Sequence, residues 1–157
     1  MIALIESIAG VLGVAEIAAS PMISGIAFGG EDFCKELGVE TNDLAMQYAR
    51  GQIVLFARYF NKYCLDTISL EYKDLKAFLL QFKNSLAMGF HSKLLIHPAQ
   101  VEAISELEKT IDVMELKEII KQYNSSTEGL VQVYGRWYEK PHIERIRKML
   151  EELEESI

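Results

Sequence analysis

The sequence has few cysteines, no excess of basic residues and no long apolar run. Its two cysteines, Cys34 and Cys64, lie far apart and match neither zinc-finger nor redox-motif spacing. With 16 Lys and Arg against 23 Asp and Glu, the formal net charge is −7, which argues against broad attraction to nucleic acid or to an anionic membrane surface. Cysteine usage of this kind predicts a reduced, cytoplasmic protein.

The apolar segments are too short to cross a membrane, which takes about 20 residues. The opening run from Met1 to Ile5 meets Glu6 and has no basic residue ahead of it, so we interpret it as a strand covered on both faces and not as a targeting segment. Hydrophobic residues make up 50% of the 157 positions and charged residues 25%, as in ordinary globular proteins. This length predicts one domain with a single core.

Apolar runs and helical patterns alternate along the first two thirds of the chain. Expected strands cover residues 1–6, 23–28, 67–70 and 92–97, and expected helices cover residues 9–19, 43–63, 75–88 and 99–108. The order strand, loop, helix repeats four times, which predicts an α/β fold with parallel strands joined by right-handed crossovers.

The pattern changes in the last third of the chain. A helix is expected over residues 113–123, a small hairpin over 130–138, and a final helix from Pro141 towards the end of the sequence. We therefore divide the chain into a βα region over residues 1–110 and an appendix over 111–157. The appendix is expected to cover a sheet edge or to reach a neighbouring subunit.

Two carboxylates directly follow apolar strands. Glu6 ends the first expected strand, and Asp32 follows the second. The C-terminal ends of parallel strands meet at one edge of a sheet, so these acids are expected to lie side by side. Close like charges need a cation between them, and Mg²⁺ takes one or two carboxylates together with substrate oxygens and water. The pair is therefore a candidate magnesium site, the alternative being that one or both acids only cap the following helix.

Gly29 and Gly30 stand at the end of the second expected strand. Glycines there permit close backbone approach, so their N–H groups can face an anionic ligand such as a carboxylate, although a tight turn without a ligand fits equally well. His97 ends the fourth expected strand and is followed by Pro98. We interpret it as a structural histidine bonded to a backbone carbonyl, with a place at the ligand face as the alternative.

The other charged residues are expected to be structural. Lys73 and Lys93 are interpreted as surface groups, and Asp66 and Asp74, which flank the third expected strand, as turn or cap residues. The sequence has no Ser-His-Asp setting, phosphate-binding loop or dinucleotide fingerprint, so acyl hydrolysis, nucleotide hydrolysis and nicotinamide chemistry have no support.

Four segments together resemble the citrate lyase β-subunit group of the HpcH/HpaI aldolase superfamily. They are IALIES at 2–7, IAFGGED at 26–32, GFHSKLLIHPAQV at 89–101 and YGRWYEKPH at 134–142, and their order and spacing agree over nearly the whole chain. The resemblance implies a TIM (β/α)8 barrel whose fifth to eighth strands are the four strands expected here. The chain would then be the second half of the barrel, followed by the appendix, either as the C-terminal portion of an enzyme or as one subunit of a split one.

The same resemblance implies an activity and a site. Family members cleave or form a carbon–carbon bond between an acetyl thioester and a 2-oxo acid such as oxaloacetate, as in citryl, malyl or citramalyl thioesters carried by coenzyme A or an acyl-carrier group. Mg²⁺ would be bound by Glu6 and Asp32, and backbone N–H groups around Gly29, Gly30 and Glu31 would receive the substrate carboxylate.

In malyl- and citramalyl-type relatives, an acid near the end of the chain reaches into a neighbouring subunit's site. Glu139 holds that place here, where relatives usually carry Asp. His97 could contact the residues that bind the metal without binding the metal itself. The family's substrate-gripping arginine belongs to the first four strands. We therefore expect the chain to self-associate or to pair with a separate chain that supplies the first half-barrel. The alternative is a truncated, non-catalytic remnant that binds a partner chain or a small dicarboxylate.

Overall fold

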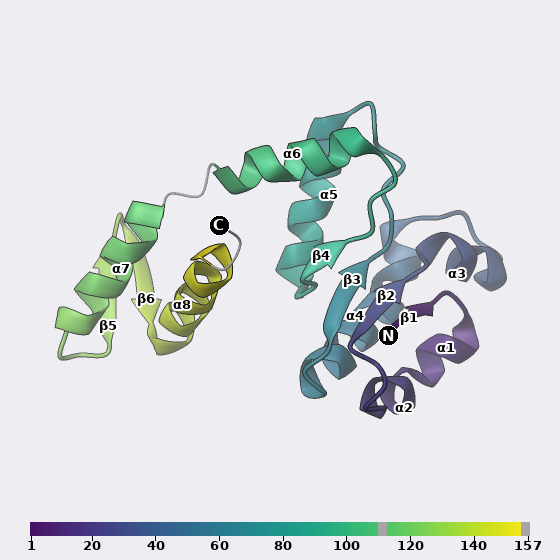
Figure 1. The fold of residues 1–157 in the computed structure, drawn as a ribbon, viewed down its shortest axis with the longest axis horizontal. Coiled ribbons are helices and arrows are strands. Elements are labelled where there is room, and N and C mark those ends of the chain that lie inside the picture. Colours follow the sequence, from purple (N-terminus) through teal and green to yellow (C-terminus); the bar gives the residue numbers. More distant parts are fainter. Residues whose placement is uncertain (110–112, 155–157) are drawn as a thin grey trace. The chain divides into compact units, whose positions relative to one another are not determined.

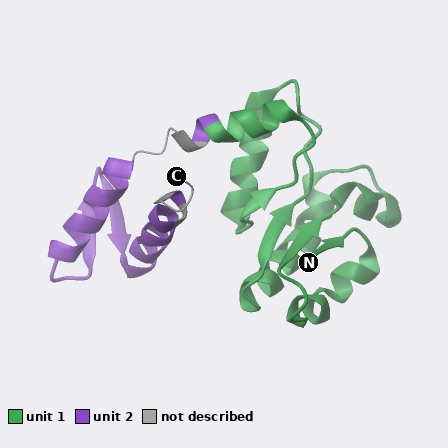
Figure 2. Ribbon diagram, in the orientation of Figure 1, with its two compact units in different colours: residues 1–105 green, residues 106–157 purple. Residues whose placement is uncertain are grey.

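The computed structural model describes residues 1–109 and 113–154, whose helices and strands are shown in Figure 1. The chain divides into two compact units, Met1–Ser105 and Glu106–Ile157 (Figure 2). The expected boundary between residues 110 and 111 lies outside the described residues. None of the described helices is long and apolar enough to span a membrane.

The first unit is built on a sheet of four parallel strands in the order β1-β2-β3-β4 (Figure 1). These strands are β1 (Ile2–Ile5), β2 (Gly25–Phe28), β3 (Tyr63–Asp66) and β4 (Ser92–Lys93). The register pairs Ile5 with Phe28 and Asp66 with Lys93, so the C-terminal ends of the strands lie along one edge of the sheet. The prediction of an α/β fold with four parallel strands is confirmed.

The third strand begins at Tyr63, and the expected strand at residues 67–70 is wrong. Helix α4 (Asp43–Tyr59) ends earlier than the apolar pattern indicates, because Asn61 takes a left-handed backbone with φ of 53° and turns the chain back. The strand can therefore start before the expected position. As a consequence, Asp66 is the last residue of a strand and not a residue of the preceding turn.

The helices of the first unit connect its strands. They are α1 (Ile8–Leu12), α2 (Val14–Ala19), α3 (Gly30–Leu37), α4 (Asp43–Tyr59) and α5 (Leu75–Met88), and α6 (Pro98–Lys109) continues into the second unit. The expected helix over residues 9–19 is divided at Gly13, and α3 was not expected from the sequence. Helix α5 ends as predicted at Gly89, whose φ of 106° needs a residue without a Cβ.

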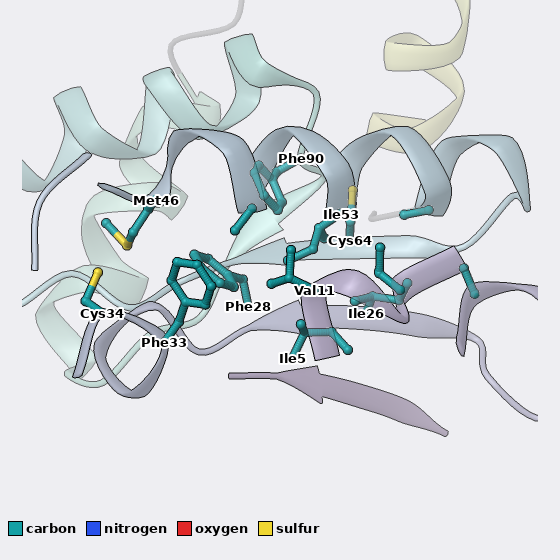
Figure 3. Close-up of a cluster of buried hydrophobic side chains, with 14 residues drawn as sticks. Ile5, Val11, Ile26, Phe28, Phe33, Cys34, Met46, Ile53, Cys64 and Phe90 are labelled. Carbon is teal, nitrogen blue, oxygen red and sulfur yellow. The ribbon is translucent and has the colours of Figure 1, made fainter. Parts of the chain in front are cut away.

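The core of this unit lies between the helices and one face of the sheet (Figure 3). Alternate strand residues share a face, and Ile5, Ile26 and Phe28 project to the helix side. Side chains from four helices pack against them: Val11, Val14, Ala18, Phe33, Cys34, Met46, Ala49, Ile53 and Ala57. Cys34 and Cys64 are free thiols buried in this core.

The opposite face of the sheet is open at β1. Ile2 and Leu4 alternate with the buried Ile5, and they remain 56% and 53% exposed. The expectation that the first strand is covered on both faces is therefore wrong for this unit. The same alternation places Glu6 on the open face.

The second unit consists of two helices and a hairpin. Its elements are α7 (Val113–Ser125), β5 (Leu130–Val133), β6 (Arg136–Glu139) and α8 (Lys140–Glu154). The strands are antiparallel, and Tyr134 and Gly135 between them have φ values of 50° and 76°, as a two-residue hairpin turn requires. Ile119, Val133 and Ile143 form the core of the unit.

The expected elements of this region are confirmed where the structure describes them. The hairpin agrees with the prediction, and the final helix is present through Glu154. Its expected continuation over residues 155–157 lies outside the described residues.

Candidate functional site at the strand ends

Glu6 follows β1 and stands at the C-terminal edge of the sheet. Its side chain is exposed, and it does not cap the next helix, because Ser7 Oγ accepts the N–H of Gly10 at 3.0 Å and serves as the cap of α1. Gly29 packs directly against this carboxylate: a Cβ atom added there would lie 3.3 Å from Glu6 Oε2. The helix-cap alternative thus does not apply to Glu6.

The turn after β2 brings Gly29 and Gly30 to the same edge. The N–H of Gly29 donates to the carbonyl of Ile5 at 2.8 Å, and the N–H of Gly30 donates to Thr67 Oγ1 at 2.9 Å. Both donors are therefore engaged within the protein. Both glycines are closely packed: an added Cβ atom would lie 2.6 Å from the Cβ of Glu6 at Gly29 and 2.5 Å from Met46 Sδ at Gly30.

Helix α3 starts in this turn and carries two more acids. Glu31 and Asp32 occupy its first turn, where negative charge is favourable. Glu31 Oε2 accepts from Thr41 Oγ1 at 2.8 Å, and the carboxylate of Asp32 is exposed. The residue before α3, Gly29, has no side chain to cap the helix, and Thr67 Oγ1 accepts only the N–H of Gly30. Within the described part of the chain, the N–H groups of Glu31 and Asp32 therefore have no acceptor.

A hydrogen bond joins the two segments that carry the candidate metal ligands. Glu36 lies one turn after Asp32 on α3, and its Oε2 accepts the N–H of Ile8 at 3.0 Å. Ile8 begins α1, two residues after Glu6. The turn after β1 and the helix after β2 are therefore tied together next to the open strand ends.

Asp66 lies at the centre of a buried charged cluster between the sheet and the helices. Arg50 of α4 donates through Nε to Oδ1 at 3.0 Å and through Nη2 to Oδ2 at 2.5 Å. Ser85 of α5 donates to Oδ2 at 2.5 Å, and Lys93 Nζ lies 3.3 Å from the same oxygen. The predictions of Asp66 as a turn or cap residue and of Lys93 as a surface group are wrong, because β3 and β4 pair in register and turn both side chains towards the helices.

The electrostatics of the cluster favour a charged Asp66. Burial alone would raise the pKa of the Asp66 carboxyl, but the Lys93 ammonium, the Ser85 hydroxyl and the Arg50 guanidinium together hold this pKa below its usual value. Burial lowers the pKa of Lys93, against the opposing effect of Asp66. Arg50 Nη1 also lies 3.4 Å from Asp43, whose side chain is 77% exposed.

A cavity of about 280 Å³ opens at the end of β3. Arg50, Lys93 and Thr67 contribute to its wall, as do the carboxylates of Glu31 and Glu71. The wall thus combines both signs of charge. It connects the Asp66 cluster with the first turn of α3.

His97 lies beyond the end of β4 and helps to start α6. Its Nδ1 accepts the N–H of Ala99 at 3.1 Å, and its ring stacks on Tyr72 with centroids 5.1 Å apart. The ring is therefore structural, but it accepts from a backbone N–H where a bond to a carbonyl was expected. Among the described contacts, none joins His97 to Glu6 or Asp32.

Three further predicted residues belong to other elements of the chain. Glu139 is the last residue of β6 in the second unit; its carboxylate is exposed, and its N–H donates to His142 Nδ1 at 3.4 Å. Asp74 caps α5 by accepting two first-turn N–H groups at 3.1 Å, as predicted. Lys73 is exposed, which confirms its interpretation as a surface group.

Glu6 and Asp32 remain the candidate pair of carboxylates for a metal ion. Across residues 1–109 and 113–154, no group of three His, Cys, Asp or Glu side chains is placed to hold a metal. Two carboxylates completed by water and substrate oxygens suit Mg²⁺, whereas a closed zinc or calcium site needs more protein ligands. Both residues are exposed, as such a partly open site requires.

Sequence reasoning missed the roles of Arg50, Thr67, Asp66 and Lys93. Asp66 carries the same signal as Glu6, an acid directly after apolar residues, and that signal identifies it once β3 is placed at Tyr63. Arg50 and Thr67 have no comparable local signal. Their roles depend on partners far away in the sequence.

Comparisons with known proteins identify relatives of this chain. The model of the HpcH/HpaI aldolase/citrate lyase family matches residues 1–98. A (3S)-malyl-CoA thioesterase of Cereibacter sphaeroides is 39% identical over 102 residues, covering 64% of this chain and 36% of that protein.

Solved structures from Mycobacterium tuberculosis are also similar. The protein CitE in complex with magnesium, acetoacetate and coenzyme A has a TM-score of 0.80 and 25% identity, over 96% of this chain and 59% of that one. A citrate lyase beta subunit complexed with oxaloacetate and magnesium has a TM-score of 0.61 and 30% identity, over 67% and 50%. The chain thus spans only part of the length of each of these proteins.

Proposed function

The chain belongs to the HpcH/HpaI aldolase/citrate lyase family, and from this membership we propose that it acts as a magnesium-dependent carbon–carbon lyase of the citrate lyase β type. The reaction cleaves or forms the bond between an acetyl thioester and a 2-oxo acid. The ligands of the relatives support both halves of this reaction, because the solved structures hold oxaloacetate, acetoacetate and coenzyme A.

In this proposal Glu6 and Asp32 hold the metal. Magnesium in the solved relatives and the two exposed carboxylates at the strand ends support the assignment. Bound there, Mg²⁺ would supply positive charge beside the oxygen that becomes the carbonyl of the oxo acid, which would stabilise the alkoxide from which the carbon–carbon bond breaks and would polarise the carbonyl when the bond forms. Glu6 and Asp32 fix the position of that charge at the open face of the sheet.

The start of α3 receives the carboxylate of the oxo acid. The N–H groups of Glu31 and Asp32 are the first-turn donors that have no acceptor in the described chain, and a helix N-terminus favours an anion. Gly29 and Gly30 contribute by letting the turn pack closely against Glu6, Met46 and Thr67 at the start of α3.

Glu139 transfers a proton in the site of a neighbouring subunit. Its exposed carboxylate at the end of the β5-β6 hairpin supports this role, since the group is free of a salt bridge within its own unit as far as the structure describes it. The proposal predicts that Glu139→Gln lowers turnover while leaving magnesium affinity unchanged.

The four strands form the second half of a (β/α)8 barrel that further strands complete. Ile2 and Leu4 on the open face support this arrangement, because exposed apolar strands and unpaired sheet edges are normally covered in proteins. For the 157 residues on their own, a second copy or a separate chain would supply these strands. Light scattering after size exclusion is expected to give a mass above that of one chain, and a stable, well-folded monomer would contradict this arrangement.

The observation that carries the proposal is the Glu6 carboxylate at the sheet edge, packed against Gly29 beside the start of α3. Calorimetric titration with Mg²⁺, and then with oxaloacetate or glyoxylate in its presence, is expected to show binding. Glu6→Gln is expected to abolish it, whereas Glu16→Gln, which changes an exposed acid of α2, is expected to leave it intact. Equal behaviour of the two variants would exclude the metal assignment.

The lyase reaction itself is tested with citryl, malyl and citramalyl thioesters of coenzyme A and of an acyl-carrier group. Release of the oxo acid from one of them, dependent on Mg²⁺ and on Glu6, is the expected result. A chain that binds Mg²⁺ and the oxo acid in its assembled form, but cleaves none of these thioesters, would contradict the lyase proposal.

A further inference from the structure

A chain of buried hydrogen bonds runs from the Asp66 cluster to the start of α3, and the proposed chemistry does not use it. Asp66 Oδ1 accepts the N–H of Thr67 at 2.8 Å, in addition to its bond from Arg50. Thr67 Oγ1 in turn accepts the N–H of Gly30 at 2.9 Å. The Thr67 side chain therefore connects the Asp66 cluster to Gly30, the first residue of α3.

Thr67 takes the place of a missing helix cap. The residue before α3 is Gly29, which has no side chain to accept a first-turn N–H group, so the acceptor for Gly30 comes from Thr67, the residue after β3. The contact is tight: a Cβ atom on Gly30 would lie 2.8 Å from Thr67 Oγ1 and 2.5 Å from Met46 Sδ. The first residue of α3 is thus closely packed against both Thr67 and Met46.

The cluster behind Thr67 is itself immobilised. Asp66 is fully buried, and its carboxylate is held by residues of α4, α5 and β4, namely Arg50, Ser85 and Lys93. Because Asp66 accepts the backbone N–H of Thr67, the cluster holds the backbone from which the Thr67 hydroxyl reaches Gly30.

We propose that Thr67, anchored by Asp66, is a positioning residue that sets the start of α3 and with it the N–H groups of Glu31 and Asp32. This inference rests on the proposed function for the role of those groups in holding the oxo acid. Thr67 itself does not touch the substrate. It acts through Gly30, which it holds against the end of β3.

Three variants separate this role from general stability. Thr67→Val keeps the shape of the side chain but removes the acceptor, and Thr67→Ser keeps the acceptor. Ser69→Ala is the matched control, because Ser69 is also buried in this loop and its Oγ accepts a backbone N–H, that of Glu71, at 3.2 Å.

The first measurement is amide hydrogen exchange at Gly30, taken relative to Gly29, whose N–H is bonded to Ile5. Thr67→Val is expected to speed exchange at Gly30 by about tenfold or more, because its N–H loses its acceptor. Thr67→Ser and Ser69→Ala are expected to stay within about threefold of the wild type. This readout needs no ligand, so it decides whether Thr67 holds α3 even if the proposed function fails.

The second measurement is the affinity for oxaloacetate at saturating Mg²⁺. Thr67→Val is expected to weaken it by about tenfold, with Thr67→Ser restoring it and Ser69→Ala leaving it unchanged. Failure of the wild type to bind Mg²⁺ and oxaloacetate would overturn the proposed function and the link to the ligand together. Unchanged exchange at Gly30 in Thr67→Val, or faster exchange with unchanged affinity, would overturn the positioning role alone.

Discussion

Gly29 lies so close to Glu6 that a Cβ atom on Gly29 would stand 2.6 Å from the Cβ of Glu6. No real side chain tolerates such a distance, so any residue other than glycine at this position has to push the turn after β1 away from the turn after β2. Glu6 can therefore lie this close to the turn before α3 only because residue 29 has no Cβ atom.

Gly29→Ala is expected to weaken Mg²⁺ binding by about 10- to 100-fold, as is typical when support for a metal ligand is lost. The displaced Glu6 would no longer share a metal with Asp32. Isothermal titration gives the affinity. Gly51→Ala is the control, because a Cβ on Gly51 in α4 meets nothing within 4 Å; it should leave Mg²⁺ affinity unchanged and raise the unfolding free energy by about 0.5–1 kcal/mol.

Arg50 pairs with two aspartates of very different burial, and their removal should have very different costs. Asp66→Asn leaves two buried cations without their carboxylate and is expected to lower the unfolding free energy by about 3–5 kcal/mol. Asp43→Asn removes a partner that is 77% exposed and should cost about 0–1 kcal/mol. Urea unfolding of both variants measures the difference, and similar losses would show that the cluster is not the stabilising element described here.

Ser85→Ala is expected to change the dependence of stability on pH. The pKa of Asp66 is lowered in the folded protein, so its contribution to stability is present above the unfolded carboxyl pKa of about 3.9 and is lost as pH falls through the folded value. Removing the Ser85 hydroxyl raises the folded pKa towards the unfolded one. The variant should therefore be less stable than the wild type near pH 7, and the gap should narrow below about pH 4. Urea unfolding at several pH values would contradict this if the gap stayed constant.

The hydrogen bond from the Ile8 N–H to Glu36 is expected to support the metal site by holding the turn after β1 against α3. Glu36→Ala removes the acceptor that ties α1 to α3 and should weaken Mg²⁺ binding by about tenfold, whereas Glu36→Gln keeps an acceptor oxygen and should remain close to the wild type. Glu40→Ala, at an exposed position shortly after α3, controls for the lost charge. Equal weakening in the glutamine and alanine variants would point to charge, and not to the bond, as the cause.

The first two strands could be predicted because their signals are local, and the same signals select Glu6 and Asp32 as candidate acids. Continuous apolar runs that end in an acid identify β1 and β2, with Glu6 and Asp32 just beyond them. Helix α3 could not be predicted in the same way, since it opens on two glycines that read as a turn. The end of α4 was hidden because Tyr63 and the residues after it continue the apolar pattern of the helix, and only the backbone at Asn61 separates the two.

The Asp66 cluster could not be predicted because its members have no common local pattern. The partners of Asp66 lie 16, 19 and 27 residues away, on α4, α5 and β4. These contacts depend on the register of β3 with β4. Because the third strand was expected at residues 67–70, Asp66 was expected to lie in the turn before it and not in the buried strand. Thr67 was missed for the same reason, because its partner Gly30 precedes it by 37 residues.

The buried ion cluster also has a consequence for the order in which the protein is made. Burial of a charged Asp66 is unfavourable until its cations, Arg50 and Lys93, are in place. Lys93 follows Arg50 and Asp66 in the sequence and is therefore synthesised after both. We therefore expect a nascent chain that has not yet added β4 to hold Asp66 in solvent and to leave Thr67 unanchored. Glu6 and Asp32 would then be synthesised before β4, but their positions would become fixed only after β4 has been added.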